Sequence, residues 1–397
     1  MKEYKLGEIC TFIGGGTPSK SIDYYWNGDI PWASVKDLKE KYISETELSI
    51  SFDGVKNSST NIANKDDLIL CTRISPGKCA ITLKETAINQ DLKIVRPIIQ
   101  NLYINEYLYY QFILLENEII SLSSGSTVKG ITLEKIKELQ VKLPTIDEQK
   151  RIVNILDIAQ ALIDKRKQAI AKLDELVQAV FLDMFGQFSD TNCKIKDVII
   201  SLQAGLSTGG ETRQKQGSEL GVLTTSAVTS GEFIDTAYKV PSEKDIKLNK
   251  LVFPTKNSIL VSRMNTRELV GASAIIEKDY NDLFIPDRLW KLTLDQRIVN
   301  PYYFLFVIQA KKIRDEVSRL SSGTSGSMLN ISQEKYLGID FYLPAKQLQD
   351  QFASMIIQIR NTKNKMKLQL QQLESNFQAL LQKAFKGELT VKDGVAV

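Results

Sequence analysis

Apolar side chains recur alternately four and three positions apart along two long stretches of the chain, as in an a/d heptad seam. Such a rhythm over more than four heptads predicts a long helix that packs on another helix. The first seam runs through Ile152, Leu156, Ala159, Ile163, Arg166, Ile170, Leu173, Val177, Val180 and Met184. The second runs through Phe352, Ile356, Ile359, Lys363, Met366, Leu370, Leu373, Phe377, Leu380 and Ala384.

The two stretches are copies of one another at a spacing of two hundred residues. Leu143-Pro144 returns as Leu343-Pro344, and Gln149 returns as Gln349. Thr145 and Glu148 form a capping box that starts the first helix, and glycine follows both helices, at Gly186 and Gly387. We expect the apolar seam residues of both helices to form an antiparallel coiled coil. Arg166 and Lys363 interrupt the seam, either fixing its register or facing solvent or a partner.

The segments that precede the helices repeat more faintly. Leu68–Arg73 parallels Ile259–Arg263, two apolar strands that each end in an arginine, and 131–135 parallels 331–335. Short β-branched strands mixed with a few helices predict an α+β fold with approximate two-fold symmetry. The expected boundaries are 1–144 for the first globular domain, 145–186 for the first helix, 187–344 for the second domain, 345–390 for the second helix and 391–397 for a tail.

Composition limits the chemistry. The 397 residues are 43% hydrophobic and 25% charged, as in ordinary folded proteins, and the net charge of +4 says little about partners. The four cysteines lie far apart, and no apolar run is long enough to span a membrane, so we expect a reduced, cytoplasmic chain. Histidine is absent, which removes the commonest general base and metal ligand.

Three motifs approach catalytic signatures without completing them. Gly14–Gly16 fits a glycine-rich cofactor turn, but Thr17-Pro18 follows where a helix should open. Asn300–Tyr303 resembles the tetrad of adenine methyltransferases without its second proline. Gly125 and Gly130 have the spacing of a P-loop, but Ile131 stands where the phosphate-binding lysine belongs. We expect no catalytic or metal site in this chain.

Basic side chains in the loops of both domains are the candidate DNA contacts. Arg73 and Arg263 stand at the same place in the two repeats, and arginine suits bidentate contact with guanine or phosphate. The full set of candidates is Lys20, Lys36, Arg73, Lys78, Lys129, Arg213, Lys215, Arg263, Arg267 and Arg288. Singly, each is better explained as a solvated surface charge; as sets on two related domains they would suffice to position a phosphate backbone.

Several phrases of the sequence resemble the DNA-specificity subunit of type I restriction-modification enzymes. They occur in the same duplicated order as in that family: Lys5–Ile9, Gly16–Ser19, Trp26–Trp32, Ser124–Ile131, Leu143–Gln149, Phe284–Leu292 and Phe385–Leu389. One departure is that the second half has Gly205–Gly209 in place of the Gly-Thr-Pro-Ser loop, so we expect the two halves to read different sequences.

The resemblance implies two target-recognition domains, each reading one half of a split DNA site. It also implies that the paired helices set the spacer between the half-sites and dock two modification (methyltransferase) subunits, which would carry S-adenosylmethionine, and that restriction (motor and nuclease) subunits complete the complex. Two alternatives stay open: an S-adenosylmethionine-dependent adenine methyltransferase, and a coiled-coil scaffold that reads no DNA. The bases recognised do not follow from the sequence.

Overall fold

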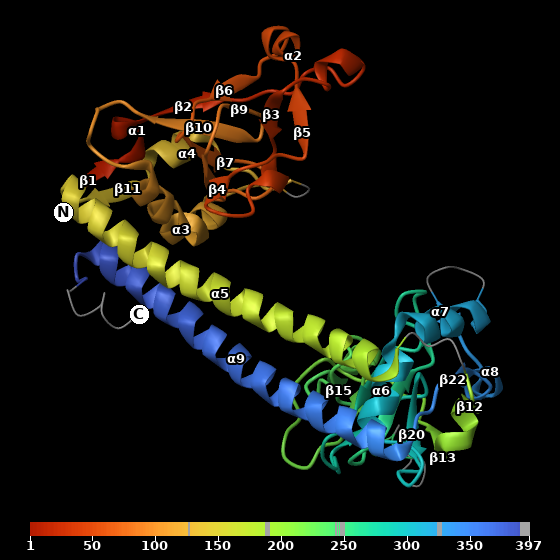
Figure 1. Cartoon of the computed structure of the whole chain (residues 1–397). Coiled ribbons are helices and arrows are strands. Elements are labelled where there is room, and N and C mark those ends of the chain that lie inside the picture. Colours follow the sequence, from red (N-terminus) through yellow and green to blue (C-terminus); the bar gives the residue numbers. More distant parts are fainter. Residues whose placement is uncertain are drawn as a thin grey trace. The chain divides into compact units, whose positions relative to one another are not determined.

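Both long helices expected from the heptad rhythm are present in the computed structural model of the chain (Figure 1). They are α5 (Ile146–Phe185) and α9 (Lys346–Lys386), of 40 and 41 residues. The structure describes residues 1–125, 128–186, 191–242, 244, 246, 251–323 and 328–389. The expected tail at 391–397 lies outside them. α9 ends four residues before position 390, because Gly387 takes a φ of +80° that closes a helix.

The chain divides into two compact units, each containing part of both long helices. The first unit is Met1–Ala169 with Lys367–Val397, and the second is Ile170–Met366. In the first unit, Leu156 of α5 shares a core with Phe377 and Leu381 of α9. In the second, Phe181 of α5 shares a core with Phe352 of α9. The start of α5 therefore packs on the end of α9, and the reverse, which makes the pairing antiparallel.

The seam residues are buried or half-buried throughout the two helices, while the positions between them are mostly exposed. The buried members are Ile152, Leu156, Ala159, Ile163, Phe352, Ile356, Phe377 and Ala384, and the half-buried ones include Ile170, Leu173, Val177, Ile359, Met366, Leu370 and Leu373. Within the part of the chain that the structure describes, no helix combines the length and the apolar character needed to cross a membrane.

Both polar interruptions of the seam have partners on the opposite helix. Arg166 donates a hydrogen bond to the side-chain oxygen of Gln369 in the first unit. In the second unit, the Lys363 ammonium lies 2.6 Å from a carboxylate oxygen of Asp174. Such partly exposed pairs contribute about 0–1 kcal/mol each. Their main effect is to favour one register, since sliding either helix by a heptad would separate the partners.

The first unit folds into two sheets with short helices. Its main sheet has the order β2-β10-β7-β8-β4, and a second sheet has the order β5-β3-β9-β6. The strands are β1 (Lys2–Lys5), β2 (Cys10–Gly14), β3 (Ile30–Ala33), β4 (Tyr42–Ile43), β5 (Leu48–Ile50), β6 (Asn61–Ala63), β7 (Leu68–Cys71), β8 (Cys79–Thr82), β9 (Thr86–Ile88), β10 (Leu92–Pro97) and β11 (Gln140–Leu143). The helices are α1 (Leu6–Ile9), η1 (Asp23–Tyr25), η2 (Val35–Asp37), α2 (Phe52–Lys56), α3 (Asn105–Leu122) and α4 (Leu133–Glu138).

The second unit repeats this plan. Its main sheet has the order β13-β20-β16-β18, and β15-β14-β19 form the second sheet. The strands are β12 (Cys193–Lys194), β13 (Ile199–Ala204), β14 (Gly221–Leu223), β15 (Tyr238–Lys239), β16 (Ile259–Ser262), β17 (Met264–Asn265), β18 (Ser273–Ile275), β19 (Leu283–Phe284), β20 (Leu289–Leu294), β21 (Leu329–Asn330) and β22 (Asp340–Phe341). The helices are η3 (Ile195–Val198), η4 (Thr225–Ala227), α6 (Pro301–Gln309), α7 (Lys311–Leu320) and α8 (Gln333–Leu337). The predicted α+β duplication is confirmed.

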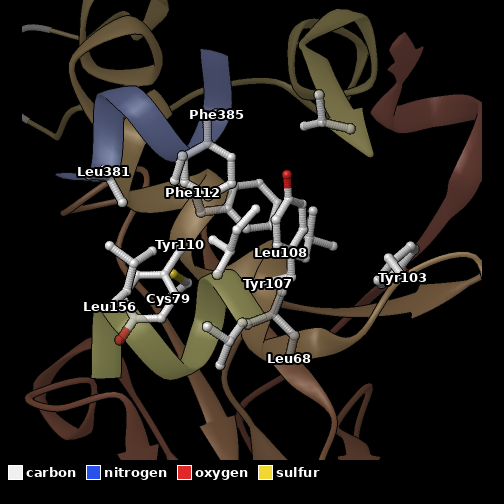
Figure 2. Packing of buried hydrophobic residues seen from close by; sticks show 14 of the residues in the cluster. Leu68, Cys79, Tyr103, Tyr107, Leu108, Tyr110, Phe112, Leu156, Leu381 and Phe385 are labelled. Carbon is white, nitrogen blue, oxygen red and sulfur yellow. The ribbon is translucent and has the colours of Figure 1, made fainter. Parts of the chain in front are cut away.

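One aromatic core joins the main sheet of the first unit to the long helices. Figure 2 shows Tyr107, Tyr110 and Phe112 of α3 among Leu68 of β7, Leu156 of α5 and Phe385 of α9. The rings of Tyr107 and Phe385 meet edge to face, with their centroids 5.1 Å apart. Burying such large side chains between sheet and helices contributes much of the stability of the unit, at about 25 cal/mol per Å² of apolar surface.

An ion pair supported by aromatic rings also ties each globular part to a long helix. In the first unit, Lys41 pairs with Asp157 of α5, and its ammonium lies 4.9 Å from the ring centroid of Tyr110. In the second, Arg360 of α9 pairs with Glu277 at 3.0 Å and lies 5.7 Å from the ring centroid of Tyr302. The cation comes from the globular part in one unit and from the helix in the other. The same kind of attachment, an ion pair beside a tyrosine ring, is therefore made by different residues in the two units.

A buried glutamine at the start of each long helix joins three chain segments. The Gln149 side chain accepts a hydrogen bond from the Ile104 amide at 3.0 Å and donates to the carbonyls of Leu102 and Pro144, both at 3.0 Å. Gln349 repeats the pattern with the Asn300 amide at 2.8 Å and with the carbonyls of Ile298 and Pro344. Both glutamines are 0% exposed. The repeat of Leu-Pro-(x)4-Gln in the sequence therefore reflects one repeated joint.

The joint makes a stability prediction. Truncating Gln149 to Ala leaves one backbone amide and two carbonyls buried without hydrogen-bond partners. We therefore expect the free energy of unfolding to fall by about 2–4 kcal/mol, seen as a lower urea midpoint. Gln349→Ala should act likewise in the second unit. Gln168→Ala, an exposed glutamine of the same helix α5, is the matched control and should leave the midpoint unchanged. A Gln149→Ala midpoint equal to that of the control would contradict the role given to the joint.

Candidate nucleic-acid interface

The predicted base-reading loops of the first unit meet at one edge of its main sheet. The register pairs Gly14 at the end of β2 with Lys93 of β10, and Cys71 at the end of β7 with Leu92. β8 begins at the same edge, where Leu70 pairs with Cys79. We call this the loop edge. It carries the glycine-rich loop after β2, the Arg73–Lys78 loop after β7 and the Asn89–Asp91 turn before β10.

The second unit has the same loop edge. There β13 and β16 end and β18 and β20 begin, as shown by the pairs Ala204–Trp290 and Ser262–Leu289. The corresponding loops are those at Gly205, at Arg263–Arg267 and at Pro286–Arg288. Two edges of identical topology thus carry unrelated loop sequences.

A glycine permits close backbone approach at each loop edge. A Cβ atom built on Gly15 would lie 2.2 Å from the carbonyl oxygen of Asn89, and one built on Gly205 would lie 1.9 Å from that of Ile285. No other residue fits in these places without moving the backbone. Gly14–Gly16 is therefore a packing feature of the β2–β10 edge, and no helix follows it, in contrast to a nucleotide-binding turn. Gly205 takes the place of Gly15 although the surrounding loop differs.

Arg73 is held at the loop edge by a buried carboxylate. Its guanidinium lies 3.6 Å from Asp91, which is 4% exposed, while the arginine side chain itself is 55% exposed. Asp91 also accepts hydrogen bonds from the side-chain amides of Asn89 and Gln90, and Gln90 is hydrogen-bonded to Thr17 of the glycine-rich loop. This chain of polar contacts links the glycine-rich loop to Arg73 and orients the guanidinium toward solvent.

Arg263 is anchored at the equivalent place through the main chain. Its Nε donates to the carbonyl oxygen of Asp287 at 2.7 Å, and its backbone amide donates to the carbonyl of Arg288. Arg288 itself is exposed beside it. The second loop edge therefore has two neighbouring arginines, where the first has one arginine held by a buried acid. This difference agrees with the expectation that the two halves read different sequences.

The other candidates of the first unit are exposed around the same region. Lys36 and Lys78 line one surface pocket together with Lys39, Glu116 and the ring of Tyr109. The carbonyl of Lys129 accepts the Ile74 amide, and Lys20 lies in the loop beyond the glycines; both side chains are exposed. All four are placed as solvated cations.

In the second unit, Arg213 and Lys215 are engaged with neighbouring carboxylates. Arg213 forms a two-bond pair with Glu219, at 2.7 Å for each bond, and also contacts Glu211. These hydrogen bonds lower the pKa of the Glu219 carboxyl to about 2. Lys215 pairs with Asp282 against the ring of Tyr238. Arg267 is exposed beside α7. Arg213 and Lys215 are therefore the least favoured of the ten candidate DNA contacts, since DNA phosphates would have to displace their carboxylate partners.

Sequence reasoning missed Lys93. This lysine is the second residue of β10, and the pKa of its ammonium is lowered, mainly by burial and further by the Arg73 guanidinium, against the opposing effect of Asp91. Its Nζ donates to the carbonyl of Gln90 at 3.4 Å. The sequence feature that could have identified Lys93 is its position two residues after Asp91, at the start of an apolar strand.

The structure offers these residues no catalytic arrangement. Asn300 caps α6, its side-chain oxygen accepting from the Tyr302 amide at 3.0 Å and its amide donating to Asp350 at 2.7 Å. Burial raises the pKa of the Cys10 thiol to about 11 and that of Cys71 above its usual value, which keeps both protonated. Among the described residues, no group of three or more acidic or cysteine side chains is placed to hold a metal.

Comparison with known proteins bears on both the sequence and the fold. Residues 1–175 match the family described as the type I restriction modification DNA specificity domain. The MjaIX specificity subunit of Methanocaldococcus jannaschii is 32% identical over 186 residues, which is 46% of this chain and 42% of that protein, so the match spans less than half the relative's length. The MjaVIII specificity subunit of the same organism is 21% identical over 407 residues, covering 98% of this chain and 93% of its own.

The crystal structure of the type I restriction-modification S subunit from M. genitalium shares the fold. It superposes with a TM-score of 0.58 at 15% identity, over 97% of this chain and 96% of that one. The family match at the amino terminus and the alignment over nearly the whole chain agree with the duplicated plan of two loop edges and two long helices. Residues 1–175 thus match a DNA specificity domain, and the whole chain is similar in sequence and fold to specificity subunits of type I restriction-modification enzymes.

Proposed function

We propose that this chain is the non-catalytic, DNA-reading subunit of a type I restriction-modification complex. The observation that carries the proposal is the repeated loop edge, because each unit presents an anchored arginine beside exposed loop residues at the same end of the same sheet. Arginines held by buried or backbone partners are preorganised for hydrogen bonds to guanine edges or phosphates. Two such edges with different loops suit a DNA site made of two unlike halves.

Each unit would read one half of a split double-stranded site. A few base pairs read in one groove give weak binding, since each correct pair is worth about 1–3 kcal/mol. Joining two readers in one chain makes the second contact intramolecular and multiplies the affinity. This is the physical advantage of duplicating the domain within one polypeptide.

The paired helices would set the spacer between the half-sites. At 1.5 Å per residue, 40 residues span about 60 Å. The continuous helices and the partnered polar positions at Arg166 and Lys363 support a rigid connection whose register is fixed. The number of unread base pairs then follows from helix length.

The outer faces of the helices would dock two modification subunits, with restriction subunits completing the complex. Large apolar side chains are exposed there, among them Ile158, Leu176 and Leu368, the last 67% exposed. S-adenosylmethionine would bind in the modification subunits, where methyl transfer takes place. Such a complex would work on DNA in the cytoplasm, where the free cysteines of this chain would stay reduced.

The two alternatives have less support. A methyltransferase would need the Asn300 side chain free to contact adenine, whereas both its polar atoms are used at the α6 cap. A scaffold that reads no DNA gives no reason for the repeated loop edge with its anchored arginines.

Removing a loop-edge arginine should relax one half-site alone. We expect Arg288→Ala, in a complex with its modification subunit, to lose discrimination of about tenfold at one or two base pairs of one half-site, which we call the second half-site. Methylome sequencing of host cells would measure this. The control is Arg297→Ala, since Arg297 lies beyond the other end of β20 and is 87% exposed. Unchanged motifs in both variants would count against the assignment of the loop edge.

Lengthening both helices should lengthen the spacer. We expect a seven-residue insertion that continues the heptad phase at equivalent points of α5 and α9 to add about 10 Å, or about three base pairs, to the unread gap. The same methylome readout gives the spacer directly. The control is a variant of unchanged helix length that carries substitutions on the exposed faces at the same points of both helices. It should keep the original spacer. An original spacer in the lengthened protein would exclude the helices as the determinant of the gap.

A further inference from the structure

Ile74 has an unfavourable backbone conformation for its residue type. Its φ is +70°, in the left-handed region. Among the residues that the structure describes, the other non-glycine residues with positive φ are Asp66, Asn101 and Asn257. Asparagine and aspartate tolerate this region, whereas a β-branched residue there is strained.

The surrounding structure enforces the strain. The Ser75 amide donates to the carbonyl of Arg73 at 2.8 Å, which closes a three-residue γ-turn around Ile74, and the form of this turn with positive φ is rare. The Ile74 amide donates to the carbonyl of Lys129 at 2.9 Å, and the Ile131 amide donates to that of Thr72 at 2.9 Å. The loop is thus fastened to a neighbouring segment on both sides of the strained residue.

The strained turn presents an apolar side chain to solvent. Ile74 is 57% exposed and is no part of the buried clusters of the first unit. Glycine or asparagine would remove the strain without uncovering a core. Stability therefore gives no reason for isoleucine here, and strain kept at an exposed site indicates a contact with another molecule.

The charges beside Ile74 indicate the kind of molecule. Arg73 precedes it with a side chain that is 55% exposed, and Lys129, whose carbonyl receives the Ile74 amide bond, is exposed as well. An exposed apolar side chain with an exposed cation on the preceding residue and another on the segment bonded to it suits the major groove of DNA, where phosphates line both sides and thymine offers a methyl group at C5.

We propose that Ile74 is a specificity-determining residue that packs on the C5-methyl of a thymine in the half-site read by the first unit. The inference rests on the proposed function. In the second unit the residue after Arg263 is Met264, which is half-buried and paired with Asn330 in β17–β21. The contact therefore belongs to the first half-site alone, which is the one that Arg288→Ala leaves unchanged.

The test compares thymine with uracil, which lacks only that methyl. Duplexes carrying the methylome-defined site, with uracil at each thymine of the first half-site in turn, are titrated with the assembled complex of this chain and its modification subunit. Wild type should lose about fourfold in affinity at one position, the value of one buried methyl group. Complexes with Ile74→Asn or Ile74→Gly should bind the thymine duplex and the uracil duplex equally at that position. They should retain their selectivity for the second half-site.

The variants also test the strain. Both Ile74 variants should unfold at the wild-type temperature or about 2–4 °C above it, because each relieves the positive φ. Ile98→Asn is the matched control: Ile98 is 51% exposed and lies beyond the opposite end of β10, and its substitution should leave the uracil effect intact.

The inference would be overturned by no uracil effect in wild type, by a first half-site without thymine, or by a uracil effect that survives in both Ile74 variants. Loss of assembly with the modification subunit, with base selectivity retained, would instead make Ile74 a protein contact and equally overturn it. None of these results touches the proposed function, which fails only if the wild-type complex shows no sequence preference in either half-site.

Discussion

The antiparallel packing of α5 on α9 is the constraint on which the rest of the structure depends. Each globular part packs against both helices at once, through the Tyr107–Phe385 contact in the first unit and through Phe181, Phe352 and Tyr303 in the second. A change in helix register would therefore disturb both the seam and the aromatic cores. The cross-helix partners of Arg166 and Lys363 add little stability but favour one register, as the proposed spacer role of the helices would require.

The duplication keeps the frame and changes the chemistry. The buried glutamine joints and the tyrosine hydroxyls that bond the carbonyls before each helix, Tyr107 to Lys142 and Tyr303 to Tyr342, are the same in both units. The loop edges differ, with an Arg73–Asp91 pair in one and Arg263 beside Arg288 in the other. A frame shared by the two units, with different loops on it, would let each half have its own specificity under the proposed function.

The sequence predicted the parts of the fold that follow from periodicity. The heptad rhythm located both helices, since packing along a seam needs regular apolar positions, and the alternating strands gave the α+β class. The strand order could not be predicted, because the sequence of a short strand does not indicate which other strands it pairs with. Of the candidate residues, Arg73 and Arg263 were found because they repeat. Other features depend on three-dimensional neighbours: the pairing of Arg213 with Glu219, the burial of Lys93 beside Arg73 and the positive φ of Ile74. Isoleucine is among the last residues that a pattern would place in such a turn.

The central claim is that one chain reads two half-sites at once, and a binding titration tests it most directly. The assembled complex is titrated with three duplexes: the full site, the site with its first half scrambled and the site with its second half scrambled. Scrambling either half should weaken binding by at least about a hundredfold, because the complex then loses several base contacts and the gain from joining two readers. Binding that stays at full strength after either half is scrambled would mean that only one unit reads DNA.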